Sequence, residues 1–257
     1  MKLLVCIKQV PDMESRFKVN ATADWYDETD LAWRMNEYDE FAVEQAVQLK
    51  EQHGDAELTV LSIGPERVKE TIKKALAMGA DRGVHIADDT SYQKDSFAIA
   101  SLIASYAKEQ GFDLIFTGLQ SQDRGSAQVG VMVAELLQIP SLTTLIEFSY
   151  ADGTVSGKRE LEGGTKAKVS CQTPALVSCQ LGLNTPRYPT LPNIMKAKKK
   201  ELLSIPNAEL APPAPRQQTT QIAPPEKKGG ALIFEGDPSE IAEKLVQLLK
   251  EKTTVLN

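Results

Sequence analysis

The sequence predicts an α/β fold: an open and mainly parallel sheet with helices on both faces, an antiparallel extension, and an extended C-terminal arm ending in a helix. Two observations predict the parallel sheet. Up to residue 140, short apolar runs alternate with longer segments of helical spacing, and three of these segments end in glycine. A third observation, a run of short segments separated by turn residues after Pro140, predicts an extension of the sheet or a small added sheet.

The first strand is expected at residues 2–8, a continuous apolar run that is typical of a strand buried on both faces. Residues 9–36 show no period and are expected to be irregular. Further strands are expected at 57–63, 83–86 and 113–117, and beyond Pro140 at 142–148, 154–160, 166–171 and 175–180. Helices are expected at 39–53, 66–78, 95–110 and about 126–137, with Asp95 or Ser96 as the N-cap of the third.

Proline content marks the C-terminal part of the chain. Residues 204–230 contain six prolines and little apolar periodicity, so we expect an extended arm there. A helix is expected at about 238–251, because its isoleucine and leucines share one face. That helix either contacts a partner subunit or folds back on the main domain. We therefore divide the chain into a main domain, 1–203, and an arm with its helix, 204–257.

Composition excludes several classes of protein. The 257 residues carry a net charge of −6, which does not suit nucleic acid. No apolar run approaches the length of a membrane span, and the five-residue apolar core at the start is too short for a signal peptide. The three cysteines form no CxxC pair, so we expect a reduced, cytoplasmic protein without disulfides.

Catalytic and metal-binding constellations are missing from the sequence. His53 and His85 are the only histidines, and their positions at a helix end and within a strand favour structural roles. No Ser/His/Asp or Cys/His set is placed for nucleophilic catalysis, and no acidic cluster has metal-ligand spacing. We therefore expect no enzyme activity from this chain alone.

The segment Gly118–Gly130 (GLQSQDRGSAQVG) is the strongest candidate binding loop. It follows a predicted strand and leads into a predicted helix, where free N–H groups and the helix dipole favour an anion. In an open parallel sheet, ligands bind beyond the carboxyl ends of the strands. The loop matches neither GxGxxG nor the Walker pattern, so a structural glycine-rich turn remains the alternative to a nucleotide site.

Residues 182–200 combine prolines at every third position, an apolar Leu191 and the basic run Lys196–Lys200. Each proline fixes φ and removes a backbone donor, so we expect a surface loop rather than a helix or an interior strand. Such a loop suits docking to another protein. The alternative is a connection whose leucine packs back into the core, with the lysines forming a solvated face.

Six motifs fit one family. They are VCIKQVPD at the start, MNEYDEFAVEQAVQLKE (35–51), ALAMGADRG (75–83), GLQSQDRGSAQVG (118–130), KRELEGG (158–164) and LNTPRYPTLPNIMKAKKK (183–200). With them the sequence resembles the β subunit of electron-transfer flavoprotein along its whole length. The resemblance implies a non-enzymatic electron carrier, an αβ heterodimer whose β subunit is a Rossmann-like domain that holds AMP as a structural nucleotide. It also implies that FAD is bound mainly by the α subunit, near the interface.

The resemblance also implies roles for individual residues. AMP contacts would fall on Cys6, Asn36, Glu37, Tyr38, Asp39, Ile63, Gly118, Leu119, Gln120, Ser121, Gln122, Asp123, Arg124, Gly125, Ser126, Ala127, Gln128 and Val129. Arg159 and Met13 would lie near the flavin, although Arg159 with Glu160 also reads as an ordinary surface pair. Docking of a dehydrogenase would fall on Pro189, Thr190, Leu191, Pro192, Asn193, Ile194, Met195 and Lys196, with Leu191 as the anchor. The arm and final helix would wrap the α subunit.

The implied partners are flavin dehydrogenases such as acyl-CoA dehydrogenase, and a membrane quinone reductase or similar acceptor. Electron-bifurcating members of the family bind a second FAD in place of AMP, and their loop reads close to DGDTAQVG. Here Arg124-Gly125-Ser126 stands where that pattern has Gly-Asp-Thr, which favours AMP, yet QVPD and AQVG are shared with the bifurcating group. Two remoter alternatives are an adenine-nucleotide hydrolase, which lacks its usual Gly-rich loop here, and a stand-alone nucleotide-binding protein.

Overall fold

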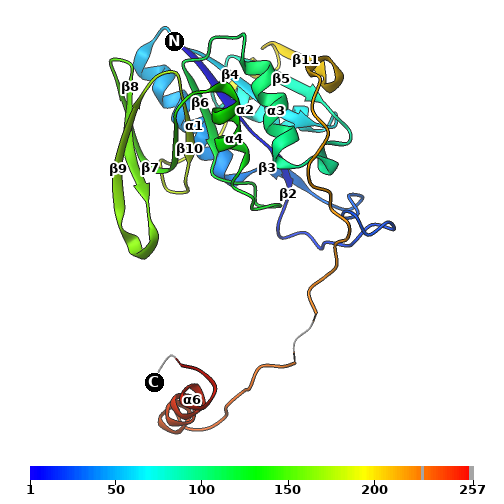
Figure 1. Ribbon diagram of the computed structural model, residues 1–257, viewed down its shortest axis with the longest axis vertical. Coiled ribbons are helices and arrows are strands. Elements are labelled where there is room, and N and C mark those ends of the chain that lie inside the picture. Colours follow the sequence, from blue (N-terminus) through cyan, green and yellow to red (C-terminus); the bar gives the residue numbers. More distant parts are fainter. Residues whose placement is uncertain (227–228, 255–257) are drawn as a thin grey trace. The chain divides into compact units, whose positions relative to one another are not determined.

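The computed structural model of the protein describes residues 1–226 and 229–254. The chain divides into two units, Met1–Ile222 and Ala223–Asn257, and each is described by itself. The first unit contains a nine-stranded sheet in the order β11-β5-β4-β1-β6-β10-β7-β8-β9 (Figure 1). This architecture confirms the predicted α/β fold.

The strands of the main sheet are β1 (Lys2–Cys6), β4 (Glu57–Gly64), β5 (Arg82–Ala87), β6 (Leu114–Gly118), β7 (Ser141–Ala151), β8 (Thr154–Glu160), β9 (Lys166–Gln172), β10 (Ala175–Cys179) and β11 (Leu202–Pro206). Pairing is parallel from β11 to β7, and the β8–β9 hairpin extends the sheet antiparallel. A separate two-stranded antiparallel sheet joins β2 (Gln9–Pro11) and β3 (Trp33–Met35).

The helices are α1 (Glu37–His53), α2 (Val68–Met78), α3 (Ser96–Ala107), α4 (Val129–Leu137), α5 (Leu191–Ala197) and, in the second unit, α6 (Pro238–Lys252). Short 3-10 turns are η1 (Ser91–Gln93), η2 (Glu162–Gly164) and η3 (Asn207–Leu210). Side chains of β1 alternate between two buried clusters. Leu3 and Val5 pack with α1 and α2, whereas Leu4 and Cys6 pack with α3 and α4. The sheet is therefore covered on both faces, as the apolar first strand predicts.

Several elements end where local chemistry predicts. Gly54 and Gly79 follow α1 and α2 with positive φ, the conformation that glycine adopts without a steric penalty. Gly111 also has positive φ, but α3 ends earlier, at Ala107, so the predicted helix stop at Gly111 is wrong. The Asp95 carboxylate accepts a hydrogen bond from the Ala98 N–H at 2.8 Å and so caps α3. Helix α4 starts at Val129 rather than 126, and β6 ends at Gly118, so the whole segment 119–128 is loop.

Other predictions are wrong in part. Strand β10 does not belong to an antiparallel extension, because it inserts in parallel between β6 and β7. The region expected to be irregular, 9–36, contains β2, β3 and an isolated bridge between Val19 and Tyr26. Strand β11 covers residues 204–206, which the sequence analysis assigned to the arm. The errors at β10 and β11 concern pairings between segments that are distant in sequence.

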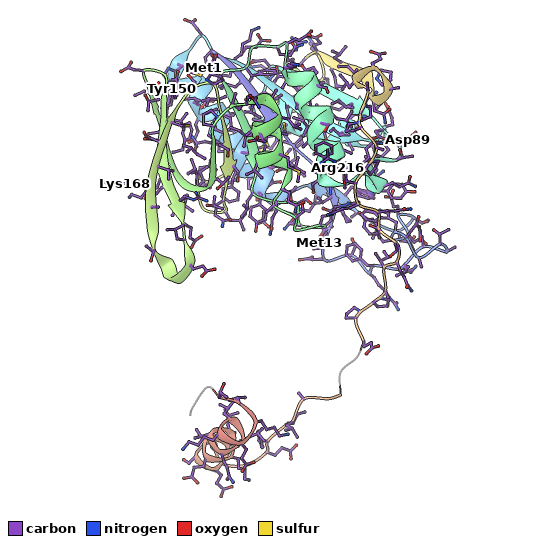
Figure 2. All side chains as sticks on the ribbon, in the orientation of Figure 1. Met1, Met13, Asp89, Tyr150, Lys168 and Arg216 are labelled. Carbon is purple, nitrogen blue, oxygen red and sulfur yellow. The ribbon has the colours of Figure 1, made fainter. Side chains whose placement is uncertain are left out.

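The proline-rich segment stays attached to the first unit as far as Ile222. The second Asp95 carboxylate oxygen accepts the backbone N–H groups of Arg216 and Gln217 at 2.7 and 3.0 Å. The Arg216 guanidinium lies 3.8 Å from the ring centroid of Phe97, beside α3 (Figure 2). The Ile222 N–H donates to the Ala23 carbonyl at 2.8 Å. This segment is extended, as predicted, but it is fixed by specific contacts.

The expectation that 182–200 contains no helix is also wrong. Helix α5 occupies Leu191–Ala197, with Thr190 as its N-cap and Pro192 within its first turn. Proline is tolerated there because first-turn N–H groups have no intrahelical partner and the fixed φ suits a helix. The prolines therefore position a short helix instead of preventing one.

Candidate functional site

A pocket lies at the carboxyl ends of the central strands, where chain winding reverses on either side of β1. This is where ligands bind in open parallel sheets. Most of the residues expected to contact AMP are part of the pocket lining. They are Cys6, Asn36, Asp39, Ile63, Gly118, Leu119, Gln120, Ser121, Asp123, Arg124, Ser126, Ala127, Gln128 and Val129. Four others, Glu37, Tyr38, Gln122 and Gly125, are not part of the lining and lie next to residues that are.

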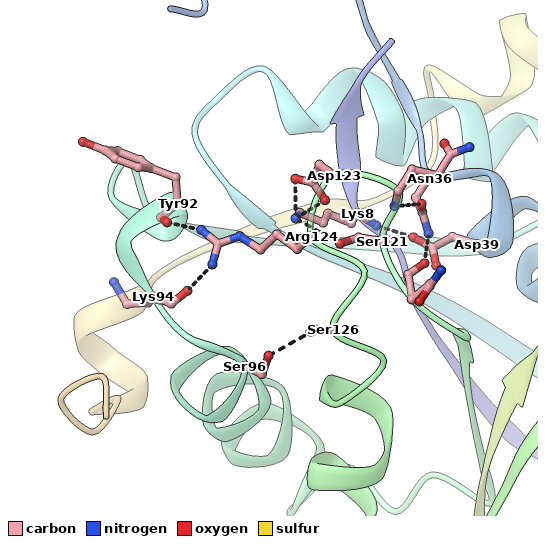
Figure 3. Close-up of polar contacts among 12 residues, drawn as sticks. Lys8, Asn36, Asp39, Tyr92, Lys94, Ser96, Ser121, Asp123, Arg124 and Ser126 are labelled. Atoms are coloured by element: carbon pink, nitrogen blue, oxygen red, sulfur yellow. Dashed lines mark hydrogen bonds and ion pairs between the residues drawn. The ribbon is translucent and has the colours of Figure 1, made fainter. Parts of the chain in front are cut away.

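Asp39, in the first turn of α1, joins the ends of two strands. Its buried carboxylate accepts the Lys8 N–H at 2.7 Å and the Gly118 N–H at 3.1 Å (Figure 3). Burial raises the pKa of Asp39 to about 7, although these two hydrogen bonds favour the ionised form. The carboxylate therefore fixes α1 against β1 and β6, and so sets one wall of the pocket.

Asn36 orders the loop that follows β6. Its amide donates to the Gln120 carbonyl at 2.9 Å, and its side-chain oxygen accepts the Gln122 N–H at 3.0 Å. The Gln122 side chain donates in turn to the Glu37 carboxylate at 2.9 Å. The start of α1 thus fixes the conformation of this loop, through hydrogen bonds of Asn36 and Glu37 to loop residues.

Lys8 and Asp123 form an ion pair at 2.6 Å across the pocket (Figure 3). The Asp123 side chain is 3% exposed and the Lys8 side chain 38%, so the carboxylate is shielded from solvent and the lysine is only partly covered. Burial lowers the pKa of Lys8, and the Asp123 carboxylate opposes that shift. The sequence analysis did not identify Lys8, because a single lysine after a strand carries no distinctive spacing.

Arg124 connects the loop to the opposite side of the pocket. Its guanidinium donates to the backbone carbonyls of Lys94, at 3.2 Å, and of Tyr92 (Figure 3). It also lies 4.8 Å from the ring centroid of Trp25. A second contact on this side joins the Ser126 hydroxyl to the Ser96 hydroxyl, at the start of α3, at 3.2 Å. The loop is thereby held between α1 and α3.

Aromatic side chains form a wall of the pocket that the sequence analysis missed. Trp25 packs on Tyr26 and Tyr92, with ring centroids 4.3 and 5.6 Å apart, and Trp33 lies 3.7 Å below the Arg67 guanidinium. All of these residues line the pocket. The signal was present as aromatic residues scattered among charges in 9–36, a segment without the periodicity that would have placed them.

Four buried polar atoms of the lining have no hydrogen-bond partner in the described part of the chain. They are the Gln9 side-chain oxygen, the Thr117 hydroxyl, the Trp25 indole nitrogen and the Arg67 Nε. Gln9 cannot turn freely, because its amide nitrogen donates to Thr71 at 2.9 Å and to the Arg67 carbonyl at 3.1 Å. Buried polar groups are normally paired, so these atoms suit a ligand that both donates and accepts hydrogen bonds.

The apolar residues expected to dock a dehydrogenase are exposed. Leu191 is 79% exposed, Met195 60% and Ile194 40%, and neighbouring Tyr188 is 90% exposed. Leu191 therefore does not pack into the core, which excludes the alternative interpretation of this segment. Apolar side chains gathered on a short, capped helix are typical of an interaction site.

The two residues expected near the flavin lie away from the pocket. Arg159 lies on β8, where its guanidinium donates to the Thr143 hydroxyl at 2.7 Å and its buried Nε atom has no partner among the residues that the structure describes. Met13 is 40% exposed, is labelled in Figure 2 and is not part of the pocket lining. The structure does not bring these two residues together with the nucleotide residues.

No catalytic or metal-binding cluster is visible in the residues that the structure describes. The imidazole of His85 is fully buried, and its nitrogens lie 3.0 Å from the Ser204 hydroxyl and 2.8 Å from the Gly64 carbonyl. Within the same residues, no group of three or more His, Cys, Asp or Glu could hold a metal. The helices of this part of the chain include none that is long and apolar enough to cross a membrane.

A family model described as "Electron transfer flavoprotein domain" matches residues 24–210. The chain belongs to the electron transfer flavoprotein family. Within this family it is similar to proteins named electron transfer flavoprotein subunit beta. The protein from Bacillus subtilis is 38% identical, with 100% of both chains covered. Those from Methylophilus methylotrophus and Mus musculus are 34% and 35% identical, with 97% or more of each chain covered. The family resemblance read from the motifs is confirmed.

Proposed function

We propose that this chain is the β subunit of an αβ electron-transfer flavoprotein and carries no reaction of its own. The relatives' shared name, subunit beta, supports a second subunit. The α subunit holds the redox FAD, which supplies reversible one-electron chemistry, and this chain completes the wall of that site. Electrons enter from flavin dehydrogenases such as acyl-CoA dehydrogenase and leave to a membrane quinone reductase or similar acceptor. The complex works in the cytoplasm, and this chain enters no membrane.

The pocket at the carboxyl ends of β1, β4 and β6 binds AMP as a structural nucleotide. The unpartnered Gln9, Thr117 and Trp25 atoms support this assignment, because adenine and ribose both donate and accept hydrogen bonds. Helix α4 begins at Val129, and its free N–H groups are a suitable site for the phosphate. The ordered loop from Gly118 to Gln128 would hold the rest of the nucleotide.

A second FAD in this pocket is the alternative, and it would make the complex electron-bifurcating. The observation in its favour is the aromatic wall of Trp25, Tyr26 and Trp33, which extends the lining beyond the loop and could accept a second planar ring. To decide between AMP and a second FAD in this pocket, the αβ complex is denatured and the released nucleotides are identified.

Arg159 and Met13 act on the flavin side of the subunit interface. The Arg159 guanidinium makes one hydrogen bond, to Thr143, and its Nε is buried without a partner in the described residues. Its remaining donors are therefore available to negative charge on a reduced flavin. Met13, with 40% of its surface exposed, would supply apolar contact there.

Leu191 anchors the dehydrogenase, with residues 189–196 as the docking element. The observation that carries this role is the exposure of Leu191, 79%, on a helix capped by Thr190. Leu191→Ala should lower electron uptake from a purified acyl-CoA dehydrogenase at least tenfold, because buried anchors dominate binding energy. Stability and nucleotide content should stay unchanged. Leu203→Ala, at a 40% exposed leucine of β11, is the control. Unchanged uptake by Leu191→Ala would exclude the anchor role.

A further inference from the structure

Arg187 ties the start of the docking segment to α1. Its guanidinium contacts two carboxylates, Glu44 at 2.8 and 3.1 Å and Glu51 at 2.6 and 2.9 Å. Its backbone N–H also donates to Glu44 at 3.1 Å. The Glu44 carboxylate is buried, and hydrogen bonds from Arg187 hold its pKa below the ordinary value against the effect of burial. The positive charge of Arg187 is therefore paired with carboxylates of its own subunit.

Lys200 ties the other end of the segment to α2. Its ammonium donates to the carbonyls of Leu76 at 2.9 Å and Ala80 at 2.5 Å, at the C-terminal end of α2. Free carbonyls at a helix C-terminus favour a cation there. Lys200 thus differs from Lys198 and Lys199, which are exposed.

Between these two attachments the chain exposes most of its apolar side chains. Tyr188, Leu191 and Met195 are 90%, 79% and 60% exposed, so their own side chains make little contact that could hold the backbone in place. Ala197, at the end of α5, is the exception, because it is 4% exposed and packs in the core cluster that includes α2. The N-terminal part of the segment therefore depends on Arg187, and its C-terminal part depends on Lys200 together with Ala197. A segment that must be ordered during binding loses affinity, because ordering costs conformational entropy.

We infer that Arg187 and Lys200 are positioning residues that hold α5 in its docking conformation before the dehydrogenase arrives. The inference rests on the proposed docking function of Leu191. Arg187 contributes most, because it joins the segment to two carboxylates of one helix through both its side chain and its backbone. The charged groups of Arg187 and Lys200 bind groups of their own subunit and do not contact the dehydrogenase.

The test uses the αβ complex with Arg187→Met, and with the exposed Arg16→Met as a control. Hydrogen exchange is measured for the peptide covering 188–198, and electron uptake from a purified acyl-CoA dehydrogenase is measured at varied carrier concentration. Arg187→Met should speed exchange in this peptide and raise the KM for the carrier about tenfold, a change of about 1.4 kcal/mol. The kcat should stay the same, because the docked complex is unchanged.

Unchanged exchange, or faster exchange with an unchanged KM, would overturn the inference. Should Arg187→Met fail to assemble, Glu51→Gln removes only the more exposed of the two carboxylates and is judged by the same criteria, with an expected rise in KM of about threefold. Leu191→Ala in the same assay separates the docking role of Leu191 from the positioning role of Arg187. If Leu191→Ala lowers uptake and the Arg187 variant does not, docking stands and the positioning role falls. If Leu191→Ala has no effect, the docking function itself falls.

Discussion

At the scale of single residues, the pocket depends on close approach between Gly118 and the start of α1. A Cβ atom at Gly118 would lie 2.3 Å from the Asp39 carboxylate, 2.6 Å from the Tyr38 Cβ and 2.9 Å from the Tyr38 backbone. Backbone cannot move aside as a flexible side chain can. Glycine at this position therefore permits the hydrogen bond between the Gly118 N–H and Asp39.

Gly118→Ala should therefore destabilise the subunit by about 1–3 kcal/mol, the usual cost of overpacking a buried site. It should also lower the nucleotide content of the purified complex, because Asp39 would be displaced. Gly230→Ala is the matched control, since among the described residues no atom beyond its chain neighbours lies within 4 Å of an added Cβ, and it should change stability by less than about 0.5 kcal/mol. Urea unfolding and nucleotide quantification measure both variants. Equal stability of the Gly118→Ala and Gly230→Ala variants would contradict this account of the pocket.

Pocket residues could be predicted from the sequence where they form one continuous stretch of the chain. The loop 118–129 was identified from its glycine, its small polar residues and its place before a helix, and most of its residues line the pocket. Lys8, Trp25 and Trp33 were missed, because each reaches the pocket through folding of a segment without periodicity. Their contribution depends on contacts such as Lys8–Asp123 that join residues more than a hundred positions apart.

At the scale of elements, helix boundaries were predictable and strand partners were not. A glycine stop or an aspartate N-cap acts within one turn, so Gly54 and Asp95 reveal helix ends locally. The parallel insertion of β10 next to β6 and the addition of β11 at the sheet edge depend on pairings between residues 61 or more positions apart. Helix α5 was missed because proline was read as a helix breaker without regard to its position in the first turn.

The basic run at the end of α5 divides into two kinds of lysine. Lys198 and Lys199 are exposed, whereas Lys200 is bound to carbonyls of the α2 end. Exposed charges beside a docking site steer encounter and make its rate depend on salt.

The double variant Lys198→Gln/Lys199→Gln should slow electron uptake several-fold at low salt and flatten its dependence on ionic strength. Lys200→Gln should instead lower stability by about 1 kcal/mol and leave the salt dependence unchanged. Stopped-flow uptake at increasing salt, with thermal unfolding of each variant, measures both effects. A salt dependence that persists in the double variant would rule out a steering role for these two lysines.

At the scale of the whole molecule, the chain divides into a self-contained first unit and a second unit with α6. The first unit contains the main sheet, the pocket and α5, and its proline-rich segment is attached through Asp95 and Ala23. Taken by itself, α6 has no buried residue, although an Asp237 N-cap orders its start. An amphipathic helix without a core of its own gains stability by packing on another surface.

Removing residues 229–257 should abolish or strongly weaken co-purification with the α subunit. The truncated chain should keep its fold, because the first unit ends at Ile222. Affinity capture through a tag on α, together with circular dichroism of the truncated chain, tests both expectations. A fully assembled complex would show that the second unit is not needed for assembly.

The central claim is that this chain contributes a structural nucleotide site and a docking surface to a simple electron carrier. Its most direct test is to denature the purified αβ complex and to separate and quantify the released nucleotides. One FAD and one AMP per heterodimer is the predicted result, with the AMP lost from the Gly118→Ala variant. Two FAD per heterodimer, with no AMP, would contradict the claim and assign the pocket to a second flavin.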